Sequence, residues 1–244
     1  MQEIQIIVLF AMSLGAAFVQ RVSGFGFGIF IMTVLPYLMP SYGEATTLSG
    51  MLAAVTSCII VARHWHYICW RNLLPILSVF LVISYIAIDF LGHTSDAVLH
   101  IMLGIALIAV SLWFYIFSDR VRLPATMPVQ VSMGTLSGIL GGLFGMQGPP
   151  AVIYFLAAED DKRRYMALAQ TYFLVGNIMM TGFRASHGYF SATVISAWCY
   201  GIVAVIAGTW LGSLVYKRLP MPALRKVIYA YMALSGIIAI CQAA

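Results

Sequence analysis

The chain has 244 residues, of which 62% are hydrophobic and only 9% are charged. A soluble domain carries about 25% charged residues, so this composition excludes an ordinary soluble domain and indicates a protein that lies in lipid. The net charge of +5 does not indicate a nucleic-acid partner, because the basic residues occupy short segments between apolar runs. Four cysteines without a CxxC pair predict neither a metal site nor a disulfide framework.

The first apolar run, residues 4–40, is interrupted by the first glycine cluster (residues 23–28), Ser23-Gly24-Phe25-Gly26-Phe27-Gly28. Glycine interrupts helices, and in lipid a broken helix leaves backbone N–H and C=O groups that only a cavity or a polar ligand can satisfy. We therefore predict a glycine-broken, re-entrant hairpin over 4–40. Residues 4–22 alone are also long enough to cross the bilayer.

Three runs of about 20 residues follow, each long enough to cross a hydrocarbon core of about 30 Å as a helix. These predicted spans are 44–62, 72–91 and 98–117.

The second glycine cluster (residues 141–150) reads Gly141-Gly142-Leu143-Phe144-Gly145-Met146-Gln147-Gly148-Pro149-Pro150. The apolar segments around it, 129–142 and 149–158, are too short to span at about 1.5 Å per residue. We therefore predict a second re-entrant hairpin over 129–158, with its glycine tip near mid-membrane. Three further spans complete the chain, predicted at 165–185, 191–215 and 222–241.

Loop charge predicts the orientation of these segments. Basic residues flank or occupy the loops 62–72, 118–128 and 215–226, whereas Asp89 and Asp96 frame the loop 90–97. The positive-inside rule places the basic loops in the cytoplasm and the acidic one outside. This arrangement works only if the second hairpin returns to the side from which it enters. It places both termini in the periplasm of a bacterial inner membrane.

The two halves, residues 1–120 and 129–244, resemble each other. Arg63 and His66 precede Arg184 and His187 by 121 residues, and the segments 86–92 and 206–212 are alike at nearly the same offset. Each half holds one hairpin and three spans, and an odd number of spans gives the halves opposite orientations. The predicted fold is an all-α polytopic membrane protein, one membrane domain of two inverted repeats.

The pattern Gly-Phe-Gly-Phe-Gly with Pro36 downstream, together with Gly-Leu-Phe-Gly-Met-Gln-Gly-Pro-Pro in the second half, resembles the TauE/SafE sulfite-exporter family of membrane permeases. The resemblance covers essentially the whole chain. It implies a permease for sulfite, a sulfonate or a related small anion. Transport would follow alternating access around a midplane site between the two glycine tips.

The residues of the tips are the first candidates for such a site. Arg21 lies in an apolar stretch, where a charge is costly and often functional, although it could also snorkel to the interface. Gln147 takes the analogous place in the second tip, and Asn177 lies on the polar stripe of its span, where interhelical bonding is the alternative. The candidate substrate-binding residues are Gln20, Arg21, Ser23, Gly24, Phe25, Gly26, Gly28, Phe144, Gly145, Met146, Gln147, Gly148, Pro149 and Asn177.

Asp89 is a candidate for proton coupling, and a carboxylate at a helix end is the alternative interpretation. The chain has no nucleophile–base motif, phosphate loop or paired carboxylates, so we expect neither an enzyme nor a cofactor. The expected partners are a small anion and the lipid bilayer, and assembly into a homo-oligomer is compatible with the sequence. An anion channel, or an intramembrane enzyme acting on a lipid, are the competing functions.

Overall fold

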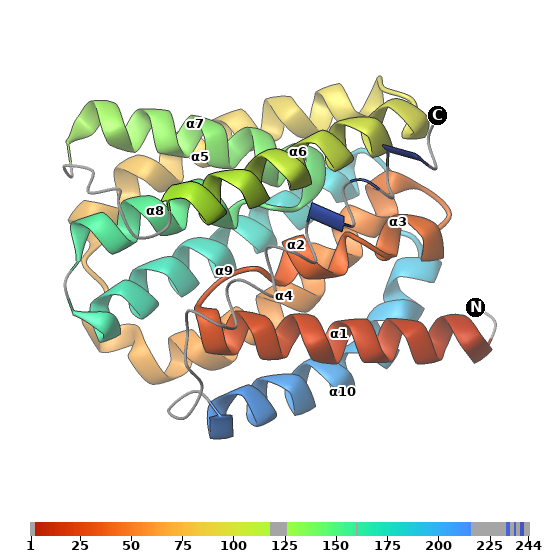
Figure 1. The fold of residues 1–244 in the computed structure, drawn as a ribbon, viewed down its shortest axis with the longest axis horizontal. Coiled ribbons are helices and arrows are strands. Elements are labelled where there is room, and N and C mark those ends of the chain that lie inside the picture. The colour runs from red at the N-terminus through yellow and green to blue at the C-terminus, as the bar shows by residue number, and fades with distance from the viewer. Residues whose placement is uncertain are drawn as a thin grey trace.

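The computed structural model of the chain describes residues 3–117, 126–159 and 161–215, together with 233–234, 237 and 240–241 near the C-terminus. These parts are helical and contain no strand (Figure 1). The elements are α1 (Glu3–Ser23), α2 (Phe27–Ile31), α3 (Leu35–Leu38), α4 (Tyr42–His64), the 3-10 turn η1 (Trp65–Tyr67), α5 (Trp70–Gly92), α6 (Asp96–Phe117), α7 (Met127–Phe144), α8 (Gly148–Ala158), α9 (Lys162–Ser186) and α10 (Ala192–Val215).

Six helical segments within the described residues are long and apolar enough to cross a membrane: Glu3–Ser23, Tyr42–Tyr67, Trp70–Gly92, Asp96–Trp113, Met127–Phe144 and Ala192–Val215. Large apolar side chains remain exposed on their outer faces, as the 61% exposed fractions of Val82 and Trp210 illustrate. A surface of this kind suits lipid and not water. The prediction of a multi-pass, all-helical membrane protein is confirmed.

The predicted spans 44–62, 72–91, 98–117 and 191–215 coincide with α4, α5, α6 and α10. The predicted span 165–185 is helical and lies inside α9, although α9 is not among the six most apolar segments, since polar residues such as Gln170 and Asn177 lower its hydropathy. The predicted span 222–241 lies mostly outside the described residues, as do most of the basic loops 118–128 and 215–226.

One expected length was wrong. The first arm of the second hairpin was expected to cover 129–142 and to be too short to span, but α7 runs from Met127 to Phe144. Pro128 lies in its first turn, where a proline costs no intrahelical hydrogen bond, so the helix begins earlier than the apolar run suggests. The second arm, α8, is short as expected, with 11 residues.

The helices pack pairwise across the two halves of the chain. In Figure 1, α1 lies along α10 at one side of the molecule, α7 lies along α5 at the other, and α4 contacts α9 between them. Glycines permit the close approach in these pairs. A Cβ atom added at Gly208 of α10 would lie 2.2 Å from the backbone oxygen of Leu14, and one at Gly142 of α7 would lie 2.8 Å from that of Ser84.

Candidate functional site

In both glycine clusters, a long helix ends at a glycine with a left-handed backbone conformation. Gly24 follows α1 with a φ of 86°, and Gly145 follows α7 with a φ of 66°. Both values lie in the left-handed region, which glycine enters without the penalty of a Cβ atom. Short helical segments then resume at Phe27 and at Gly148. The chain therefore breaks and restarts at equivalent places, 121 residues apart.

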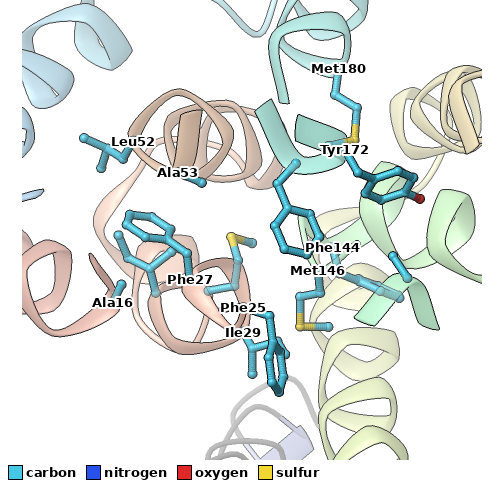
Figure 2. Close-up of a cluster of buried hydrophobic side chains, with 14 of the residues drawn as sticks. Ala16, Phe25, Phe27, Ile29, Leu52, Ala53, Phe144, Met146, Tyr172 and Met180 are labelled. Carbon is cyan, nitrogen blue, oxygen red and sulfur yellow. The ribbon is translucent and has the colours of Figure 1, made fainter. Parts of the chain in front are cut away.

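The two breaks meet inside the protein. A Cβ atom added at Gly28 would lie only 2.0 Å from the carbonyl oxygen of Gly145, so the two backbones are in direct contact. Figure 2 shows the surrounding apolar side chains, with Phe25 and Phe27 of the first tip and Met146 of the second in one buried cluster. Residues of the two glycine clusters, which are far apart in the sequence, are thus packed together in the protein interior.

A small cavity, with a volume of about 30 Å³, lies between the clusters. We call it the inter-cluster cavity. It is lined by residues of both glycine clusters and of α1, α2, α4 and α9, namely Gln20, Phe25, Gly26, Phe27, Gly28, Ile29, Ala53, Gly145, Met146, Gln147, Gly148, Phe173 and Asn177. Among the described residues, the lining has no charged side chain; its polar groups are three carboxamides and the backbone.

A first set of hydrogen bonds ties the end of α1 to α4 and α9. The Gln20 amide nitrogen donates to Ser57 Oγ at 2.9 Å and to Gln170 Oε1 at 3.0 Å. Gln170 in turn donates from Nε2 to the carbonyl oxygen of Gly24 at 2.7 Å. All three side chains are buried, so these bonds fix the position of the first glycine cluster in a region with little water.

A second set ties the other tip to α7 and α9. The Gln147 amide nitrogen donates to Asn177 Oδ1 at 3.1 Å and to the carbonyl oxygen of Phe173 at 3.4 Å. The hydroxyl of Ser137 donates to the carbonyl oxygen of Gln147 and accepts from the Tyr172 hydroxyl at 2.7 Å. Carboxamide nitrogens therefore hold both tips against α9.

Arg184 is a candidate functional residue that the sequence prediction did not include. It is fully buried in α9, and its guanidinium donates to the carbonyl oxygens of Thr46, Gly141 and Gly142 at 3.2, 2.8 and 3.0 Å. Gly141 and Gly142 belong to the last turn of α7, where the negative end of the helix dipole favours a cation. A positive charge thus holds the helix that ends at the second glycine cluster.

The spacing of three residues in α9 is a sequence signal that could have identified Arg184. Gln170, Asn177 and Arg184 are separated by seven residues each, which places them on one face of a helix. The prediction used Asn177 alone as a site residue and read Arg184 only as part of the internal repeat. The structure brings the whole face toward the two tips.

The structure places several predicted site residues away from the inter-cluster cavity. Arg21 is half-buried and donates from Nε to Ser213 Oγ of α10 at 2.7 Å, so its side chain contacts α10. Ser23 and Gly24 lie just behind the lining, where the Ser23 hydroxyl donates to the carbonyl oxygen of Phe25 at 2.6 Å. Phe144 is buried in the surrounding apolar cluster, and Pro149 lines a separate apolar cavity between α6, α7 and α8.

Asp89 lies at the end of α5, and 57% of its side chain is exposed. Its carboxylate is 3.3 Å from Nε2 of His187, which follows α9. The other ring nitrogen of His187 is 2.8 Å from the carbonyl oxygen of Phe183. The Phe183 carbonyl and the Asp89 carboxylate raise the pKa of His187 above its ordinary value, because two acceptors favour the doubly protonated ring.

The sequence of this chain is similar to those of known membrane exporters. The family model described as "Sulfite exporter TauE/SafE" matches residues 9–238. A protein of Cupriavidus necator described as "Probable sulfite/organosulfonate exporter TauE" is 26% identical over 225 residues, which cover 86% of this chain and 82% of that protein. No solved structure matches.

Proposed function

Because this chain belongs to the sulfite exporter TauE/SafE family, we propose that it carries sulfite, a sulfonate or a related small anion across the membrane through the inter-cluster cavity. The observation that carries this proposal is the shared lining of that cavity. Residues of both glycine clusters line one buried space, although half the chain separates them in the sequence. Paired helix breaks that converge on one cavity are typical of the substrate sites of secondary transporters.

The chemistry of the cavity suits weak, reversible binding of an anion. No carboxylate lines it within the described residues, and three carboxamides supply neutral polar groups. Gly148 offers a backbone N–H at the start of α8, whereas Pro149 and Pro150 have none, so the half-helix contributes fewer donors than its position suggests. A site with few donors releases its ligand readily, as transport requires.

Arg184 supplies the positive charge that the lining lacks. Its Nη1 and the Asn177 Oδ1 each lie 3.7 Å from the Cβ position of Gly50, so the guanidinium is close behind a lining residue. The charge of Arg184 can attract an anion in the cavity without touching it, because little water screens a buried cation. In this proposal Arg184 attracts the anion without binding it, and the carboxamides and backbone contact the ligand directly.

The reciprocal packing of the helices supports a mechanism of alternating access. α1 of the first half packs along α10 of the second, and α7 of the second half packs along α5 of the first. Inverted repeats produce pairings of this kind. We propose that one repeat rocks against the other around the contact of Gly28 with Gly145, which would open the cavity to each side in turn.

Reconstitution of the purified protein into liposomes tests the proposed function. Radiolabelled sulfite should enter by saturable uptake, and unlabelled sulfite inside the liposomes should accelerate it by counterflow, which a channel does not show. Asn177→Leu should abolish uptake, because it removes a polar lining group and one of the two acceptors of the Gln147 nitrogen. Asn72→Leu is the matched control, since it removes the same group near the start of α5.

Uptake by the Asn177→Leu variant at the wild-type rate would exclude the inter-cluster cavity as the substrate path. Linear, non-saturable flux without counterflow would show a channel.

A further inference from the structure

Two residues that line the inter-cluster cavity each hold a buried acceptor atom without a donor. Gln20 and Gln147 are 2% and 5% exposed, both line the cavity, and the Oε1 atom of each accepts no hydrogen bond from the described residues. A buried acceptor without a donor is unfavourable, so such atoms are rare unless a ligand or water completes them.

Backbone carbonyls determine which amide atom of Gln20 faces the cavity. The carbonyl oxygen of Gly24 can only accept, so Gln170 must present its nitrogen to Gly24 and its oxygen to Gln20. Gln20 must then present its own nitrogen to Gln170, which leaves its oxygen without a donor.

The same reasoning applies to Gln147. The carbonyl oxygen of Phe173 fixes the Gln147 nitrogen, which also donates to Asn177, and the Gln147 oxygen remains without a donor. Both glutamines therefore line the cavity and hold an acceptor without a donor, and an anion without hydrogen atoms to donate would leave both acceptors unpaired.

Among the described residues, Arg184 is the one charged side chain that is buried. Arg184 is fully buried, and within the described part of the chain no carboxylate forms an ion pair with it. One cation balances one negative charge. Since the desolvation penalty of an ion rises with the square of its charge, a dianion costs about four times as much to bury as a monoanion of the same size.

We propose that the transported species is a singly charged oxyanion that carries its own hydrogen-bond donor, and that dianions are rejected. Gln20 and Gln147 accept the hydrogen bond from the ligand, while the field of Arg184 balances its charge. This inference rests on the proposed function. The donor can be the acidic proton of the oxyanion, as in hydrogensulfite, or a hydroxyl substituent, as in a hydroxyalkanesulfonate.

A matched pair of ligands isolates the donor. 2-Hydroxyethanesulfonate and ethanesulfonate have the same charge at every pH near neutrality and differ by one hydroxyl group. Calorimetry on the protein in lipid nanodiscs should find the hydroxylated ligand bound about two- to tenfold more tightly, the range expected for one net hydrogen bond. Equal affinities, or tighter binding of ethanesulfonate, would refute the role of the donor.

A pH titration isolates the acidic proton. As pH rises from 5.5 to 8.5, hydrogensulfite loses its proton, and the affinity for total sulfite should fall in proportion to the monoanion that remains. The cavity lining has no titratable side chain within the described residues, and Arg184 behind it stays charged. Ethanesulfonate controls for titration of the protein, and sulfate should not bind at any pH. Sulfite binding that is constant or stronger at high pH would overturn the proposal.

Substitution of the two glutamines tests which residue accepts the hydrogen bond from the ligand. Gln147→Met should remove the preference for 2-hydroxyethanesulfonate over ethanesulfonate, and Gln20→Met provides a second test if that variant does not fold. Arg21→Gln, a change outside the cavity lining, should keep the preference. If no sulfur oxyanion binds at any pH, the proposed function itself fails. If all bind without discrimination, the proposed function stands and this inference fails.

Discussion

The contact between the two glycine tips makes a prediction that can be worked out from the structure. Gly28→Ala would place a Cβ atom 2.0 Å from the carbonyl oxygen of Gly145 and 3.0 Å from its carbonyl carbon. The first distance is far below van der Waals contact, and both neighbours are backbone atoms that cannot rotate away. The tips must therefore separate by about 1 Å, in a protein interior that is packed too densely to absorb the shift without strain.

The expected magnitude follows from two opposing effects. Overpacking of a tight interior costs about 1–3 kcal/mol. Alanine gains up to about 1 kcal/mol over glycine through its lower chain entropy in the unfolded state. The net expectation for Gly28→Ala is a loss of about 0–3 kcal/mol in stability, together with a loss of transport, because the inter-cluster cavity lies at this contact.

Gly182→Ala is the matched control. It makes the same chemical change inside α9, where no atom lies within 4 Å of the added Cβ, and it should keep or raise stability. Thermal unfolding in detergent and sulfite counterflow in liposomes measure the two effects. If Gly28→Ala melts and transports like the wild type, the two tips are not in contact and the reasoning about the cavity fails.

Three further predictions concern charged residues. Arg184→Met should lower the melting temperature and abolish anion binding, because it removes the charge and the guanidinium hydrogen bonds to three carbonyl oxygens; Arg184→Lys should recover part of the binding by restoring the charge. Binding by Arg184→Met at wild-type affinity would contradict the electrostatic role. Arg21→Gln should keep wild-type affinity in calorimetry, since Arg21 contacts Ser213, and a loss of binding would return Arg21 to the site. His187→Gln should reduce stability most at low pH, because a raised pKa means that the ion pair with Asp89 contributes fully below about pH 6.5 and is lost as pH rises through the folded-state value. Unfolding curves of both proteins from pH 5 to 9 measure this difference, and a difference that grows with pH would have the wrong sign.

The sequence is sufficient to predict the features that depend on composition along the chain. Apolar length predicts α4, α5, α6 and α10, because crossing lipid requires a minimum number of residues. The glycine clusters predict where the long helices end, because left-handed backbone at Gly24 and Gly145 excludes most other residues. The same reasoning singled out Gln147 and Gly148, which the structure brings to one cavity with Gln20 and Gly28.

Features that depend on rotation about a helix axis were harder to predict. Gln20 and Arg21 are neighbours in the sequence, yet about 100° of rotation separates them, so one lines the cavity and the other contacts α10. Apolar residues surround both on every side of α1, and the pattern therefore does not distinguish the two faces. Arg184 was missed for a related reason, since its partners are backbone carbonyls of α4 and α7, which no side-chain pattern reveals.

The seven-residue spacing on α9 restricts how the chain can change in length. Gln170, Asn177 and Arg184 span about 21 Å of helix and contact the first tip, the second tip and the end of α7 in turn. Insertion or deletion of one residue between Gln170 and Arg184 would rotate one end of this series by about 100° relative to the other. We therefore expect the length of this stretch to be fixed. Variants of this chain should tolerate substitutions on the outer face of α9, but not insertions or deletions between Gln170 and Arg184.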